Sequence, residues 1–280
     1  MAVGITRTRL DRTTATNDPE ETSVSDRTPI IAGNWKMHRD HLEAIQLVQK
    51  LAYHLVEEDY EGQEIVVCPP FVALRSVQTL IQSDKLPIAL GAQNCHAEDE
   101  GAFTGEISVP MLARLDVSYV ICGHSERRAL FGETDADVAA KARAVLRQHL
   151  RPILCVGEVK DEREAGRAVE VVVGQLRGSL EGITIDDPED LVIAYEPVWA
   201  IGTGLTATTD DAQEMCAAIR EELATRFDRA TAEQVRIQYG GSVKPGNIAQ
   251  LMAQQDVDGA LVGGASLSSE DFALIVGYRR

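Results

Sequence analysis

The sequence predicts an α/β protein, a single closed (β/α)8 barrel with a disordered N-terminal extension. Short apolar segments alternate with helical stretches eight times, which is the pattern of a parallel sheet covered by helices. Residues 28–280 also match the length of about 250 residues that such a barrel needs. The alternative is an open, doubly wound sheet, which usually carries G-x-G-x-x-G after its first strand. Here Gly33, Asn34, Trp35 and Lys36 stand at that place, which favours the barrel.

Residues 1–27 are expected to form a disordered tail that precedes a barrel domain over residues 28–280. This stretch is rich in Thr, Asp, Glu and Arg and has few aliphatic residues, so it has too little apolar surface to order itself. Three arginines make a transit peptide conceivable, but Asp11 and the later acidic residues argue against one.

The eight strands are expected where short runs of apolar residues end in small or polar ones. They cover residues 29–33, 64–68, 87–92, 119–122, 151–156, 191–195, 234–239 and 259–262. The helices between them are expected at 42–58, 72–83, 109–115, 135–149, 162–180, 209–227, 247–252 and 269–277.

Composition and charge narrow the classes of partner. The chain is 44% hydrophobic and 25% charged, which is ordinary for a globular protein, and no apolar run approaches the roughly 20 residues of a membrane helix. The net charge of −17 argues against a nucleic-acid or anionic-membrane partner. The five cysteines are scattered without a C-x-x-C pair, so a disulfide framework and a zinc site are not expected, and a cytoplasmic location fits.

A single carboxylate stands at the end of the sixth predicted strand. Glu196 follows a buried apolar run, and Pro197 closes that strand because it has no N–H to donate. The segment 197–206 contains aliphatic residues, Trp199, Gly202 and a second glycine, which is the pattern of a flap that expels water from a bound substrate. Taken alone, Glu196 is equally compatible with an incidental loop residue.

Two other strands end in candidate polar groups. Lys36 and Asn34 follow the first strand and would project a cation and an amide into the barrel mouth. His124 follows the fourth strand and leads into a helical turn, whose positive end favours the neutral imidazole. Glu126 could anchor Lys36, and the two arginines that follow it are expected to form structural ion pairs. Each residue alone is also compatible with a surface lysine or a structural histidine.

Glycine pairs follow the seventh and eighth strands. Gly240 and Gly241 precede Ser242, and Gly263 and Gly264 follow the last strand. Loops at these two positions form the recurrent phosphate site of such barrels, because glycines let backbone N–H groups approach an anion closely. One pair alone would be a weak signal, since tight turns also use glycine.

No cofactor and no metal are expected. The six histidines are dispersed, and neither a Walker loop nor a nucleotide fingerprint is present. The predicted site thus combines a base, a neutral imidazole, a fixed cation and backbone N–H groups that can bind phosphate. This combination indicates proton abstraction beside a carbonyl in a small phosphorylated molecule.

These stretches resemble the triosephosphate isomerase family. The resemblance rests on motifs that occur in the order AGNWKM (32–37), GAFTGE (101–106), GHSERR (123–128), YEPVWAIGTG (195–204), YGGSV (239–243) and VGGASL (262–267). It implies the TIM barrel and the interconversion of dihydroxyacetone phosphate and D-glyceraldehyde 3-phosphate, with Glu196 and His124 as catalytic residues. It also implies that substrate binds to Asn34, Lys36, Gly202, Ser242, Gly263 and Gly264. The alternative is a catalytically silent or different phosphosugar-binding barrel on the same scaffold.

The resemblance also implies a homodimer, in which residues 93–106 reach into the partner. Thr104 would then lie near Asn34 and Lys36 of the partner subunit. Two positions depart from the usual pattern: Leu205 stands in the lid where lysine is common, and Ala97 replaces a bulkier residue of the interface loop.

Overall fold

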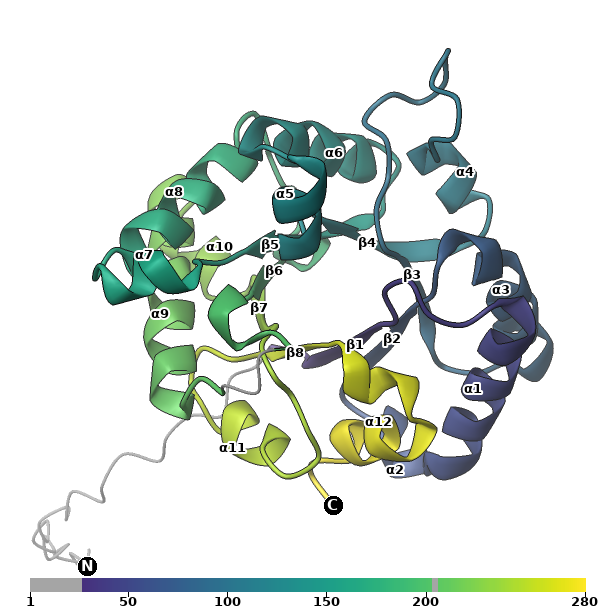
Figure 1. The fold of residues 1–280 in the computed structure, drawn as a ribbon. Helices are drawn as coiled ribbons and strands as arrows, with labels where there is room; N and C mark the ends of the chain where they lie inside the picture. Colours follow the sequence, from purple (N-terminus) through teal and green to yellow (C-terminus); the bar gives the residue numbers. More distant parts are fainter. Residues whose placement is uncertain (1–26, 203–205) are drawn as a thin grey trace, which may run out of the picture.

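Eight parallel strands close into a barrel, and helices form a ring around it, as the view along the barrel shows (Figure 1). The structure is a computed structural model that describes residues 27–202 and 206–280. Each strand pairs with the next in sequence order, and β8 pairs with β1 to close the sheet. This arrangement confirms the predicted (β/α)8 barrel.

The strands lie where the apolar segments predict them, within two residues at either end. They are β1 (Ile30–Asn34), β2 (Glu64–Cys68), β3 (Ala89–Ala92), β4 (Val117–Cys122), β5 (Arg151–Val156), β6 (Val192–Tyr195), β7 (Arg236–Tyr239) and β8 (Gly259–Val262).

The outer ring contains helices of very different length. They are α1 (His41–His54), α2 (Glu57–Tyr60), α3 (Phe71–Asp84), α4 (Val109–Ala113), α5 (Ser125–Phe131), α6 (Asp135–Arg147), α7 (Lys160–Glu164), α8 (Ala168–Ser179), α9 (Thr209–Arg226), α10 (Arg229–Ala232), α11 (Ile248–Met252) and α12 (Ser269–Val276).

Two predicted helices are each divided in the structure. The expected helix 42–58 ends at His54, because Leu55 and Val56 adopt extended backbone before α2 begins. The expected helix 162–180 is divided into α7 and α8 by Gly166, whose φ of 70° places it in the left-handed region that ends a helix. The short helix α10 was not predicted, since a four-residue turn has too few residues to show a helical period.

The core has two layers, which follow from the alternation of side chains along each strand. In β1, Ile30 and Ala32 pack inside the barrel with residues such as Tyr119 and Ile153. Ile31, between them, packs outward against the surrounding helices. The strands are therefore buried on both faces, and this accounts for their nearly unbroken apolar sequence.

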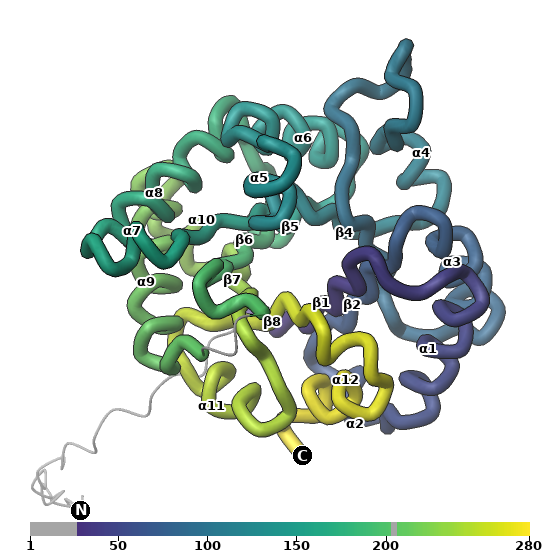
Figure 2. Tube along the Cα trace, in the orientation of Figure 1, coloured from purple at the N-terminus to yellow at the C-terminus, as the bar shows by residue number. Residues whose placement is uncertain are grey.

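The loops at the C-terminal ends of the strands carry the polar motifs, and the one between β3 and α4 projects furthest from the barrel (Figure 2). Residues 1–26 of the expected tail lie outside the described residues. Arg27 is described, and its Nε donates to Asp258 at 2.5 Å. No helix in the described part of the chain is long and apolar enough to cross a membrane.

Candidate active site

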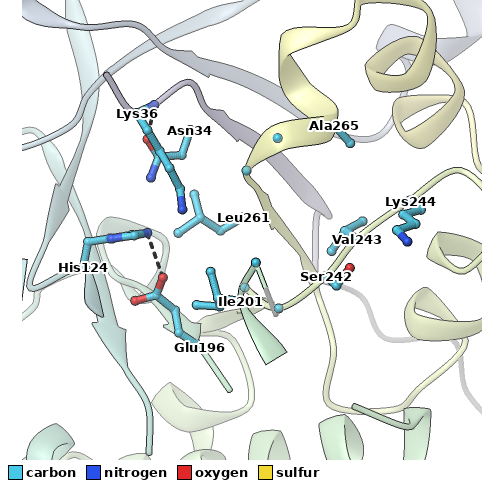
Figure 3. A pocket seen from close by; sticks show the side chains of 15 residues that line it. Asn34, Lys36, His124, Glu196, Ile201, Ser242, Val243, Lys244, Leu261 and Ala265 are labelled. Atoms are coloured by element: carbon cyan, nitrogen blue, oxygen red, sulfur yellow. Dashed lines mark hydrogen bonds and ion pairs between the residues drawn. The ribbon is translucent and has the colours of Figure 1, made fainter. Parts of the chain in front are cut away.

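The structure brings all eight predicted site residues to one cavity of about 290 Å³ at the mouth of the barrel. The lining includes Asn34, Lys36, His124, Glu196, Gly202, Ser242, Gly263 and Gly264. They come from the ends of five strands, because the carboxyl ends of parallel strands meet on one face. Further lining residues that the sequence did not single out include Ile201, Leu261 and Lys244 (Figure 3).

The carboxylate of Glu196 is buried and held at both oxygens. The residue follows β6 and is only 2% exposed. Its Oε1 lies 2.9 Å from Nε2 of His124, and its Oε2 accepts the backbone N–H of Ser125 at 2.8 Å (Figure 3). The backbone N–H of Glu196 donates to the carbonyl of Val156 at 2.8 Å. The acid is therefore positioned by the neighbouring strand β5 and by the first residue of α5.

The backbone around His124 explains its placement and its tautomer. Gly123 has a φ of 73°, and a Cβ there would lie 2.6 Å from Val138, so the turn into α5 needs glycine. His124 is the N-cap of α5, and its Nδ1 accepts the backbone N–H of Glu126 at 3.2 Å. An accepting Nδ1 carries no proton, so the single proton of the neutral ring is on Nε2 and points to Glu196.

The pKa values of the pair move in opposite directions. Burial acts to lower the pKa of His124, but the adjacent carboxylate of Glu196 outweighs it and raises that pKa above its ordinary value. This direction is opposite to the one that the sequence predicts from the helix terminus alone, because the charge of Glu196 lies closer to the ring. Burial acts to raise the pKa of Glu196, but His124, the Ser125 N–H and Lys36 lower it below its ordinary value. Glu196 is therefore an ionised carboxylate in a site with little solvent.

Lys36 is fixed by its backbone as well as by its side chain. Its φ of 53° is in the left-handed region, which lysine rarely adopts. Its N–H donates to the side chain of Asn34 at 3.0 Å, and its carbonyl accepts from Gln93 at 2.8 Å. Its Nζ lies 2.6 Å from Oε1 of Glu126, as the sequence predicts. Gln93 was not recognised as a site residue, although a polar residue directly after a predicted strand was an available signal.

The two arginines that follow Glu126 in α5 form ion pairs outside the cavity. Arg127 pairs with Glu133, and Arg128 pairs with Asp135 at 2.5 Å, as expected of structural ion pairs. These contacts tie α5 to Glu133, which precedes α6, and to Asp135, the first residue of α6.

The first part of the predicted lid rests on a buried acid that the sequence analysis missed. Glu158 is fully buried and accepts from Trp199 at 2.7 Å and from the Tyr195 hydroxyl at 3.2 Å. Gly202 lines the cavity with a φ of 69°, but residues 203–205, including Leu205, lie outside the described residues. Arg163, five residues along the chain, also pairs with Glu158 at 3.4 Å. The contacts of Glu158 with the lid could not be predicted locally, because Tyr195 and Trp199 are about 40 residues away in sequence.

The glycine-rich loops after β7 and β8 form one side of the cavity. Gly263 and Gly264 lead into a short 3-10 turn, and Ser266 donates its hydroxyl to the Gly263 carbonyl at 2.7 Å. Ser242 lies in the loop after β7, and its carbonyl accepts from the side chain of Asn247 at 2.9 Å. Within the described residues there is no group of three or more His, Cys, Asp or Glu side chains that could hold a metal ion. All five cysteines are buried free thiols.

A family model and the sequences of curated relatives match most of this chain, and they agree on one family. The family model for triosephosphate isomerase matches residues 29–279. A triosephosphate isomerase of Streptomyces coelicolor is 57% identical over 256 residues, which cover 91% of this chain and 99% of the relative. One from Herpetosiphon aurantiacus is 57% identical over 253 residues, which cover 90% of this chain and 100% of the relative. One from Cutibacterium acnes is 55% identical over 254 residues, which cover 90% of this chain and 98% of the relative.

Proposed function

Because this chain belongs to the triosephosphate isomerase family, we propose that Glu196 and His124 interconvert dihydroxyacetone phosphate and D-glyceraldehyde 3-phosphate at the barrel mouth. The observation that carries this assignment is the 2.9 Å contact between Nε2 of His124 and Oε1 of Glu196, on the wall of the cavity that Lys36 also lines. A carboxylate base and a neutral imidazole donor that face one ligand are the groups this reaction needs. This pairing in this family is also a known example of pKa tuning.

The reaction is a proton transfer through an enediolate. Glu196 removes a proton from the carbon beside the ketone, and the electron pair of that C–H bond forms the carbon–carbon double bond. The Nε2–H of His124 hydrogen-bonds to the carbonyl oxygen as it becomes negative and moves a proton between the two substrate oxygens. Glu196 then returns its proton to the neighbouring carbon, which gives the aldehyde.

Lys36 and Asn34 stabilise the developing oxyanion in this proposal. Their backbone and side-chain contacts to one another and to Gln93 hold them in place before substrate binds. A preorganised donor of this kind is worth about 3–4 kcal/mol of transition-state stabilisation. The pairing of Lys36 with Glu126 at 2.6 Å keeps the ammonium aimed into the cavity.

The phosphate group is bound by backbone N–H groups around Gly202, Ser242, Gly263 and Gly264. All four residues line the same cavity as the base. Glycine pairs at the ends of β7 and β8 allow the close approach that an anion requires. The segment from Pro197 onward closes over the substrate and protects the enediolate from water.

Homodimer formation and a cytoplasmic location complete the proposal. The loop between β3 and α4 projects from the barrel (Figure 1), and Phe103 on it is 44% exposed. Met37, next to Lys36, is 93% exposed. Exposed apolar residues on a protruding loop and beside the site support an interface there. Light scattering on the purified protein tests it, because a dimer has twice the mass of the chain.

The test of the activity is a coupled assay with glyceraldehyde 3-phosphate, run in parallel in deuterated water. We expect turnover, and we expect solvent deuterium on carbon in the product, because the proton on Glu196 exchanges with solvent during the enediolate stage. Absence of turnover would support the silent barrel instead. Turnover without deuterium on carbon would contradict exchange of the proton on Glu196 with solvent. Glu196→Gln, purified in the same way, is the control for contaminating enzyme.

A further inference from the structure

The cavity contains one cation whose charge no neighbouring carboxylate balances. Lys36 pairs with Glu126 at 2.6 Å, so much of its charge is compensated. Lys244 also lines the cavity, and within residues 27–202 and 206–280 no carboxylate oxygen lies within 4.0 Å of its ammonium group. The proposed function does not use Lys244.

The loop that carries Lys244 is held in a defined shape. The Lys244 N–H donates to the side chain of Asn247 at 2.8 Å, and Asn247 donates in turn to the Ser242 carbonyl at 2.9 Å. The side chain itself is exposed. Figure 3 places it beside Ser242, on the side of the cavity away from His124 and Glu196. It therefore lies at the end where the backbone N–H groups gather.

The overall charge of the protein makes such a cation useful. A net charge of −17 repels an anionic substrate over long range, so the attraction has to be local. A backbone N–H cradle supplies partial charges only, whereas an unpaired ammonium supplies a full one at the cavity edge.

We propose that Lys244 recognises the phosphate monoester dianion of the substrate, by attracting it to the cavity and holding it against the Ser242 loop. This inference rests on the proposed function. Because Lys244 lies away from the His124–Glu196 pair, it acts on substrate binding and leaves the proton-transfer steps unchanged. Because its side chain is exposed, salt screens its contribution.

The test compares Lys244→Gln with Lys50→Gln, which makes the same change in net charge on the exposed face of α1. At low ionic strength we expect Lys244→Gln to raise KM for glyceraldehyde 3-phosphate about tenfold, with kcat within about twofold of the native protein. The difference should shrink to about twofold in 0.5 M salt, where the Debye length is only a few Å. Lys50→Gln should change neither constant, and Lys244→Arg should keep KM near the native value.

Inorganic phosphate provides a readout that does not need turnover. Calorimetry should show about tenfold weaker binding of phosphate to Lys244→Gln than to the native protein or to Lys50→Gln. Equal KM and equal phosphate affinity in the two glutamine variants would overturn the inference. A Lys244→Arg variant as weak as Lys244→Gln would also overturn it, because loop shape rather than charge would then be responsible. A native protein that binds phosphate but turns over no triose would contradict the proposed function separately.

Discussion

The Nε2 atom of His124 lies 2.9 Å from Oε1 of Glu196, while the other oxygen of that carboxylate accepts the Ser125 N–H. The imidazole N–H and the carboxylate oxygen are thus paired with each other across the barrel mouth. A substrate carbonyl that enters between them takes over the Nε2–H, and this frees Oε1 to accept a proton from carbon. The contact therefore keeps Glu196 ionised before substrate binds. When the contact is replaced by the substrate, the carboxylate is free to accept a proton.

Shortening the base should slow proton transfer. Glu196→Asp withdraws the carboxylate by about one C–C bond, and a misplacement of that size lowers kcat by about 100-fold or more. The measurement is steady-state kinetics with glyceraldehyde 3-phosphate, with circular dichroism to show that the fold is kept. Glu222→Asp is the control, because it shortens another buried glutamate, which pairs with Arg177 outside the site. Unchanged kcat in Glu196→Asp would show that another group is the base.

Removing the charge of Glu196 should lower the pKa of His124. The carboxylate raises this pKa against the opposite effect of burial, so in Glu196→Gln the effect of burial remains and the pKa falls below the ordinary value of 6.5. NMR titration of the imidazole in both proteins measures the change. The other five histidine rings of the chain serve as internal controls. A pKa that stays the same or rises would mean that the carboxylate does not face the ring in solution.

Gln175 should support the base through the backbone. Its side-chain amide accepts from the Gly157 N–H at 2.8 Å and donates to the Gly157 carbonyl at 3.0 Å. Gly157 packs so closely on Glu196 that a Cβ there would lie 1.8 Å from the Glu196 carbonyl oxygen. We expect Gln175→Leu to lower kcat about tenfold with little change in KM, because the base loses alignment while the binding groups stay in place.

The matched control for this prediction is Gln213→Leu. Gln213 holds Asp256 in a similar way, accepting from its N–H at 3.0 Å and donating to its carboxylate at 2.6 Å, away from the cavity. Both variants should lose about 1–3 kcal/mol of stability, since each leaves backbone or side-chain groups unpaired. Only Gln175→Leu should lose kcat when both are assayed well below their melting temperatures. An equal effect on kcat would assign Gln175 a purely structural role.

Local patterns predicted the barrel and the residues that line its mouth, because both follow from strand periodicity and from the rule that active sites lie where strands end. His124 and Glu196 could each be found directly after a buried strand. Glu158 and Gln175 could not be given their roles, because Trp199 and Gly157, which they contact, are distant from them in sequence. Gln93 was overlooked, although it directly follows a predicted strand. The breaks at Leu55 and Gly166 were missed for another reason: apolar spacing continues across them, while the backbone turns.

The opposite end of the barrel should carry a pH-dependent part of the stability. Glu64 begins β2 and pairs there with Arg236 at 2.7 Å, Arg151 at 3.1 Å and the Tyr119 hydroxyl. Burial alone would raise the pKa of Glu64, but these three partners lower it below its ordinary value of 4.5. Since the folded pKa is below the unfolded one, the contribution is present above about pH 4.5 and is lost as the pH falls through the folded pKa.

Glu64→Gln should therefore lower the melting temperature at pH 7, and the difference from the native protein should shrink as the pH drops below about 4.5. Leaving the arginines without their carboxylate costs about 1–3 kcal/mol, which corresponds to about 2–6 °C for a chain of this size. Calorimetric scans from pH 3 to 7 measure both effects. Glu61→Gln, an exposed acid just before β2, makes the same charge change and should show neither. A difference that persists unchanged at pH 3 would mean that Glu64 stabilises the barrel by packing rather than by its charge.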